Sequence, residues 1–151
     1  AEVVVLTIPH PHEYDTAKAL AAPLRGKTVV DVSVPLTNYK PPEAELPPEG
    51  SAAEAVQAIL GNGTPVVAAF KTTSSVVLEE VERELVSDEL VCSDDQDAKA
   101  VVMGLVEAIG ARALDAGRLR NARAMELMTA VLIGLDQRYK KRDIGFRFTN
   151  V

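Results

Sequence analysis

Lys71 is the residue whose type and position most directly suggest chemistry. It follows the apolar run from Val66 to Phe70, which is typical of a buried strand, so its ammonium would stand where that strand leaves the sheet. A cation at this place could meet a phosphate or a ring oxygen of a ligand. The alternative is a surface lysine that keeps its alkyl stem on apolar neighbours and its charge in water.

The other polar candidates do not assemble into a catalytic or metal-binding set. His10 and His12 flank a proline at a helix start, so they cannot both face one metal from a single helical face. The pair Ser74-Ser75 has no evident base and no nucleophile-elbow motif, which disfavours a serine hydrolase. The pair Asp94-Asp95 is more typical of a helix cap than of two catalytic carboxylates. We therefore predict no catalytic side chain and no metal site.

Glycine-rich phosphate loops are absent from the sequence. Neither G-x-G-x-x-G nor a P-loop motif follows any predicted strand. A dinucleotide bound by this chain would thus find no cradle for its diphosphate within these 151 residues.

Composition and charge exclude several function classes. The chain is acidic, with a net charge of −6, and its basic residues lack aromatic stacking partners, which disfavours nucleic-acid binding. Residues 101–151 nevertheless carry 9 Lys and Arg against 5 Asp and Glu, which favours this third for an anionic ligand. No apolar stretch is long enough for a membrane span, and no signal peptide is evident, so the cytoplasm is the expected compartment. The single Cys92 lies in an apolar run and is expected to be a buried thiol.

Apolar periodicity predicts alternating strands and helices. The run 35–50 is rich in proline and is expected to be an extended loop without regular structure, and 144–148 alternates like an edge strand. A capping box at Ser51-Ala52-Ala53-Glu54 starts one helix, and the helix near 121–138 is apolar nearly all round, so we expect it to be buried or to contact a second subunit. The predicted strands are 3–8, 28–34, 65–70, 89–92 and 112–116, and the predicted helices are 11–22, 51–61, 76–86, 94–110 and 121–138.

This alternation predicts an α/β fold with a doubly wound parallel sheet. Ligands bind such sheets beyond the carboxyl ends of the strands, which here are residues 9–10, 34–35, 71–75 and 93–95. The first strand is apolar throughout and lacks a polar edge, so we expect a further segment of sheet to precede it.

Four segments, taken in order, resemble the F420-dependent NADP oxidoreductase family. The most specific runs from Leu114-Asp115-Ala116-Gly117 through Leu119, Asn121-Ala122-Arg123 and Glu126 to Thr129. The other three are Val5-Leu6-Thr7-Ile8-Pro9, Val34-Pro35-Leu36 followed by Gly50-Ser51-Ala52-Ala53-Glu54, and Val66-Val67-Ala68-Ala69-Phe70. The resemblance covers almost the whole chain.

The resemblance implies an oxidoreductase that transfers a hydride directly between NADP(H) and the deazaflavin coenzyme F420. It implies a Rossmann-like NADP-binding domain over residues 1–110, without the N-terminal glycine-rich unit, and a small helical region over 111–151 that carries the deazaflavin side and a dimer contact. Lys71 stands where the family commonly has His or Asn. Cofactor contacts carried over by position, or placed at these strand ends, are Thr7, Pro9, His10, Val34, Pro35, Lys71, Thr72 and Thr73.

Two other functions remain open at this stage. The chain could be a non-enzymatic interaction domain derived from such a reductase, held to a partner by its apolar helix. It could also be a different NADP-dependent oxidoreductase. The expected partners are small redox cofactors and a second copy of the chain, with no nucleic acid and no membrane.

Overall fold

Three parallel strands form the centre of the molecule. The computed structural model describes residues 1–151. Strands β1 (Val3–Leu6), β2 (Thr28–Asp31) and β5 (Val66–Ala68) lie in the order β1-β2-β5. Val29, Val30, Val66, Val67 and Ala68 are fully or almost fully buried, as expected for a parallel sheet covered on both faces. The predicted α/β fold with a parallel sheet is confirmed.

A second strand pair runs in the opposite direction. Strands β6 (Asp88–Val91) and β7 (Arg112–Asp115) are parallel to each other. The backbones of Ala68 and Cys92 exchange hydrogen bonds of 2.9 and 3.1 Å in an antiparallel bridge. Residues 93–95 therefore lie at the opposite edge from the carboxyl end of β5, and our expectation that they join the other strand ends was wrong. The sequence pattern of a buried strand does not encode its direction.

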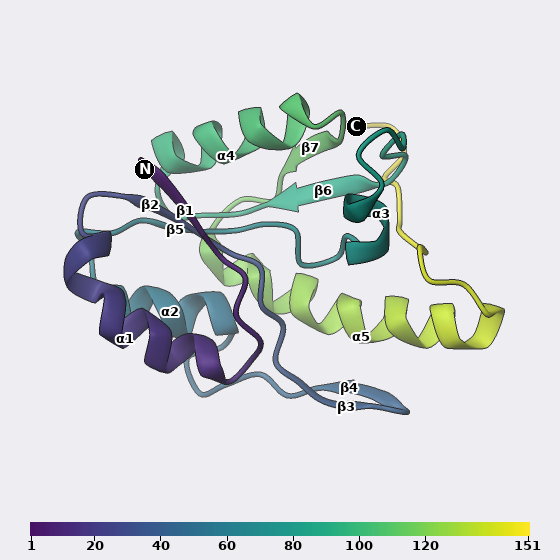
Figure 1. Ribbon diagram of the computed structural model, residues 1–151, viewed down its shortest axis with the longest axis horizontal. Coiled ribbons are helices and arrows are strands. Elements are labelled where there is room, and N and C mark those ends of the chain that lie inside the picture. The colour runs from purple at the N-terminus through teal and green to yellow at the C-terminus, as the bar shows by residue number, and fades with distance from the viewer.

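Helices cover both faces of the sheet (Figure 1). Helix α4 lies on one face, and α1, α2 and α5 lie on the other. Two hydrophobic clusters reflect this: Val30, Val67 and Val91 pack towards α4, while Val29, Val66 and Cys92 belong to the cluster that includes α1, α2 and α5. The helices are α1 (His12–Leu24), α2 (Ala52–Leu60), α3 (Ser75–Glu79), α4 (Gln96–Ala108) and α5 (Ala122–Tyr139), with a 3-10 turn at Leu119–Asn121.

The predicted helix caps fix where α2 and α4 begin. The hydroxyl of Ser51 accepts the N–H of Glu54 at 3.1 Å and donates to the Glu54 carboxylate at 2.8 Å. Asp95 accepts the N–H of Ala98 at 2.8 Å. Each cap satisfies a backbone donor that has no partner inside its helix. Both predicted starts are confirmed, as is the burial of Cys92.

The proline-rich run is not an irregular loop. Strands β3 (Leu36–Tyr39) and β4 (Pro42–Ala44) form an antiparallel hairpin, which packs against α5. Prolines are tolerated at the start of a strand and at an edge, where their missing N–H is not needed for a ladder. The backbone carbonyl oxygen of Tyr39 in this hairpin accepts a hydrogen bond from the side chain of Gln137 on α5 at 2.5 Å.

Two further predicted elements are shorter or absent. The helix expected over 76–86 is only the five residues of α3, none of which is buried. A short helix without a packed apolar face is not stable. The tail at 144–148 forms no strand, although the Phe146 carbonyl oxygen accepts the Asp88 N–H at 3.0 Å and the Asp88 carboxylate accepts the N–H of Phe148 at 2.6 Å. The acidic residues Glu79, Glu80, Glu82 and Glu84 are exposed, as predicted.

Residues 111–151 contain β7 as well as the long helix. The buried Met125 of α5 shares the larger hydrophobic cluster with α1 and α2. The opposite side of α5 is exposed at Leu127 (46%) and Val131 (59%). No helix in the structure combines the length and hydrophobicity required to cross a membrane.

Candidate functional site

A cleft of about 710 Å³ opens at the carboxyl ends of the three parallel strands. The residues that follow the three strands form its walls. They are Thr7, Ile8 and Pro9 after β1, Val32 and Ser33 after β2, and Phe70, Lys71 and Thr73 after β5. This is the edge where open α/β sheets bind ligands, and the volume is that of a typical small-molecule site. The remaining lining residues are Val5, Tyr39, Ser75, Leu78 and Ile109.

Four of the eight sequence-predicted cofactor contacts line this cleft. They are Thr7, Pro9, Lys71 and Thr73, and they come from two different strand ends. The structure thus brings together residues that are more than 60 positions apart in the sequence.

The other four lie outside the cleft lining. Strand β2 ends at Asp31, earlier than the predicted end at residue 34, so Val32 and Ser33 take the wall position expected for Val34 and Pro35. Pro35 is buried. His10 turns to Glu13, with its Nδ1 at 2.8 Å from the carboxylate. Thr72 is buried and lines a separate pocket with Thr129 and Leu132.

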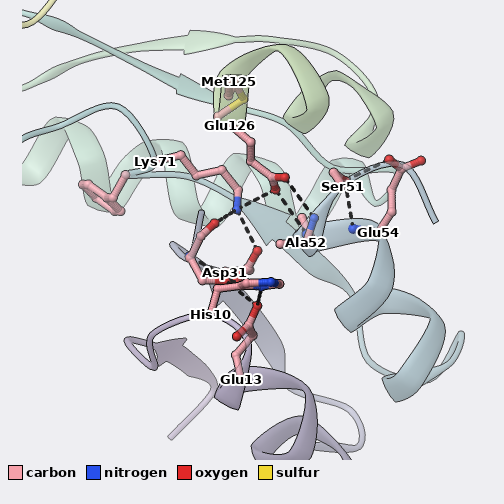
Figure 2. A network of polar contacts seen from close by, with 12 residues as sticks. His10, Glu13, Asp31, Ser51, Ala52, Glu54, Lys71, Met125 and Glu126 are labelled. Carbon is pink, nitrogen blue, oxygen red and sulfur yellow. Dashed lines mark hydrogen bonds and ion pairs between the residues drawn. The ribbon is translucent and has the colours of Figure 1, made fainter. Parts of the chain in front are cut away.

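A buried ionic cluster forms the base of the site (Figure 2). The Lys71 ammonium lies 2.8 Å from Asp31, 3.0 Å from Glu126 and 2.5 Å from the Ser33 carbonyl oxygen. All three charged side chains are completely buried. Because an ammonium has three donors, these partners occupy every one of them. Lys71 is therefore not a surface lysine, and the snorkelling alternative is wrong.

The cluster joins four elements. Asp31 ends β2, Lys71 follows β5, and Glu126 projects from α5 to accept the N–H groups of Ala52 at 2.9 Å and Ala53 at 3.3 Å. Those N–H groups form the amino end of α2, which attracts negative charge. The hydroxyl of Ser33 donates to Asp31 at 2.8 Å. The cluster therefore fixes the cleft wall relative to α2 and α5.

Burial and ion pairing have opposite effects on the pKa values of Lys71 and Glu126. Burial alone would lower the pKa of Lys71, but Asp31 and Glu126 outweigh it and hold the pKa above its ordinary value. Burial raises the pKa of Glu126, although Lys71 and the Ala52 N–H oppose that rise. Lys71 is therefore charged at neutral pH, and its N–H groups are directed to the two carboxylates and to the Ser33 carbonyl oxygen.

A second buried carboxyl group supports the cleft from β6. Glu89 accepts the N–H of Phe70 at 2.5 Å and is hydrogen-bonded to the hydroxyl of Thr73. Phe70 has a φ of +56°, in the left-handed region that costs energy for a residue with a side chain. Burial raises the pKa of Glu89 to about 7, even though its two hydrogen bonds lower it. Glu89 thus holds the strained turn that shapes this wall.

Sequence reasoning missed Asp31, Glu126 and Glu89 as members of the site. The available signal was one charged residue in an otherwise apolar segment: Asp31 interrupts a run of valines, and Glu126 lies between Met125 and Leu127. A charge at a core position needs a partner, and Lys71 was the cation predicted at the sheet edge. No group of three or more His, Cys, Asp or Glu side chains is arranged to hold a metal ion.

Comparison with known proteins identifies relatives over almost the entire chain. The chain is 41% identical to the F420-dependent NADP reductase of Methanocaldococcus jannaschii, across 99% of this chain and 69% of that protein. It is 40% identical to the F420-dependent NADP reductase of Methanothermobacter thermautotrophicus, across 100% of this chain and 67% of that protein. Residues 55–149 also match a family model described as the PRAME N-terminal domain, so this part belongs to that domain family, whose description names no chemistry.

The solved structures agree with the sequence comparison. The crystal structure of a proposed F420-dependent NADP reductase from Arthrobacter sp. FB24 matches with a TM-score of 0.89 and 25% sequence identity, over 99% of this chain and 70% of that one. Together with the identity of two-fifths to curated reductases, this match shows that the chain belongs to the family of F420-dependent NADP reductases.

Proposed function

We propose that this chain forms the ring-binding cleft of an oxidoreductase that passes a hydride directly between NADP(H) and coenzyme F420. The relatives are named for these two substrates, and the chain shares their family. The observation that carries the proposal is the cleft at the carboxyl ends of β1, β2 and β5, with seven hydrophobic residues among its 13 lining residues. Such a cleft suits flat, partly apolar rings.

The cleft residues have roles that follow from this reaction. Direct transfer needs two rings held face to face with the reacting atoms about 3 to 3.5 Å apart. Pro9, Val32 and Phe70 offer apolar surface that excludes water, and Thr7 and Thr73 offer hydroxyl groups to ring edges. Lys71 contributes mainly by holding the wall, because its ammonium is already bound by protein groups. The organic cofactors supply the chemistry of the transfer.

We further propose that the glycine-rich turn for the NADP diphosphate lies in a segment outside these residues. No such motif occurs within the chain. One edge of β1 pairs with β2, and the other edge has no strand beside it. The curated relatives are also longer, since the chain spans 69% and 67% of their lengths. A parallel strand added at that edge would place a glycine-rich turn beside Pro9.

We also propose which part of the chain serves each cofactor. Residues 1–110 would carry the nicotinamide side, and residues 111–151 would support the deazaflavin side and a homodimer contact through the exposed half of α5. The cytoplasm, where reduced nicotinamide is available, is the proposed place of action. The exposed Leu127 and Val131 support the dimer part of the proposal.

Filling the cleft tests the proposed function. In the longest form of the protein that its gene encodes, Val32→Trp should raise the KM for F420 at least tenfold, because the indole would occupy the space for the ring. The matched control is Val101→Trp on α4, where the valine is half exposed and lies outside the cleft. The readout is the loss of deazaflavin absorbance with NADPH. Equal KM values for F420 in the two variants would show that the deazaflavin ring does not bind in this cleft.

A further inference from the structure

Glu89 is a buried acid without a cation to balance it. It is 1% exposed, and its carboxylate contacts the Phe70 N–H and the Thr73 hydroxyl. Its neighbour Asp88 is different, because Arg112 holds both of its oxygens at 2.7 and 2.6 Å. A carboxyl group kept in the core without a counter-charge favours its protonated form.

Glu89 forms no ion pair, and both of its hydrogen-bond partners are neutral. On β7 the paired residue is Ala113. In the segment after β5, Lys71 directs its ammonium to Asp31 and Glu126. Glu89 can therefore bind and release a proton without breaking an ion pair.

Thr73 connects this acid to the cleft. Its side chain lines the cleft, and its hydroxyl is hydrogen-bonded to Glu89. A hydroxyl can donate one proton while it accepts another, so it can pass a proton between a buried acid and a ligand. The cleft lining contains no Asp, Glu or His side chain. Its other ionisable groups are Lys71, whose donors are occupied, and Tyr39, which is 64% exposed.

We propose that Glu89 and Thr73 form a proton relay that protonates the ligand ring during hydride transfer in this cleft. The proposal rests on the proposed function, because reduction of a deazaflavin consumes a proton as well as a hydride. Thr73 is the group that touches the ring, and Glu89 acts through it.

The relay balances the reaction in both atoms and charge. The nicotinamide C4–H bond breaks, and its electron pair and hydrogen form the new C–H bond at C5 of the deazaflavin. The electron pair displaced by this addition leaves negative charge on the pyrimidine part of the ring. The O–H bond of Thr73 breaks, a ring N–H bond forms at N1, and the proton of the Glu89 acid re-forms the Thr73 O–H. The Glu89 carboxylate then takes a proton from water, so that NADPH, F420 and one proton give NADP⁺ and reduced F420.

Two variants separate the relay from a structural role. Glu89→Gln keeps an oxygen acceptor for the Phe70 N–H but removes the acid, and Thr73→Val keeps the shape but removes the hydroxyl. In the longest form of the protein, the wild-type kcat for F420 reduction should fall as pH rises through about 7. Each variant should lower kcat at pH 6 about 100-fold, which is typical of a lost general acid. Each should also remove this pH dependence while leaving the KM values within about twofold.

The control removes a negative charge that contacts nothing in the cleft. Glu82→Gln, at an exposed position, should match the wild type at every pH. If either relay variant has the same kcat and the same pH profile as the wild type, the relay is overturned and the proposed function still stands. A wild type that does not reduce F420 at any pH would reject the proposed function and the relay with it.

A measurement on the ligand-free chain gives a second readout. Carboxyl ¹³C NMR should show Glu89 titrating at about 7, as its burial requires. In Thr73→Val the pKa should rise further, because the hydroxyl hydrogen bond lowers it in the wild type. A Glu89 carboxyl that titrates like an exposed glutamate, or that does not respond to the loss of the hydroxyl, would contradict the relay.

Discussion

Lys71 balances two carboxylates in the core, and its removal would leave both without a cation. Lys71→Met keeps the length and apolar character of the stem, so the change is confined to the ammonium. We predict a loss of about 3 to 5 kcal/mol in the free energy of unfolding, the usual cost of an unpaired buried charge. Urea denaturation at pH 7 measures it.

The matched control is Lys18→Met on α1. Lys18 lies 3.3 Å from Asp15, and both side chains are largely exposed. Exposed ion pairs contribute little, so this variant should change the free energy of unfolding by less than about 1 kcal/mol. Equal effects of the two substitutions would show that the buried cluster carries no special stability.

At this scale the sequence predicted the position of Lys71 but not its role. A lysine directly after a buried strand is visible in the sequence, as are Asp31 in a run of valines and Glu126 on an apolar helix. Their meeting depends on how α5 crosses the sheet, and no local pattern encodes that crossing. Four of the residues predicted as cofactor contacts line the cleft, because strand ends can be located from the sequence.

Helix α5 presents apolar side chains on two sides. Met125 and Leu132 are buried in the domain, while Leu127 and Val131, four residues apart, are about half exposed. If this second side is the homodimer contact, Leu127→Glu should convert the dimer to a monomer, because a charge would replace apolar area at the interface. Light scattering after size-exclusion chromatography measures the mass.

Val101→Glu on α4 is the comparison, since Val101 is exposed to a similar degree (50%) on another helix. The Val101→Glu variant should have the same mass as the dimeric wild type. A monomeric wild type, or a dimer that survives Leu127→Glu, would exclude this face of α5 as the contact.

Elements with caps and a continuous apolar face were predictable, and those without them were not. The starts of α2 and α4 follow from Ser51 and Asp95, whose side chains satisfy free backbone donors. The hairpin β3–β4 was missed because its prolines stand at an edge, where they do not disrupt pairing. Helix α3 is shorter than its periodicity suggests because it has no face to pack against.

For the whole molecule, Glu89 makes stability depend on pH in an unusual direction. Its pKa is raised in the folded state from 4.5 to about 7, so the folded protein binds more protons than the unfolded chain between these values. Stability from this group is fully present below pH 4.5 and is lost as pH rises through about 7. Paired carboxyls such as Asp88 have a lowered pKa, so they make stability depend on pH only below about pH 5.

We therefore predict that the free energy of unfolding falls between pH 5 and pH 7.5, by up to about 3 kcal/mol from Glu89. Urea melts at the two pH values measure the change, and Glu89→Gln should remove this part of it. The same fall in Glu89→Gln as in the wild type would assign the pH dependence to other groups.

The direction of β6 was the main feature of the whole fold that the sequence did not provide. Strand β6 ends in the apolar residues Leu90 and Val91, and nothing in its sequence indicates that it runs antiparallel to β5. This reversal places Glu89, near the start of β6, beside Thr73 at the end of the β5 segment. The buried acid reaches the cleft only because of that reversal.

Isotope transfer tests the central claim, which is that two rings meet face to face over the ends of β1, β2 and β5. The longest form of the protein is mixed with F420 and with NADPH that carries deuterium at the transferred C4 position, in ordinary water. The mass of the reduced F420 is then measured. Direct transfer predicts one deuterium in each molecule of product, at C5. Reduced F420 that carries only hydrogen from water would contradict the account.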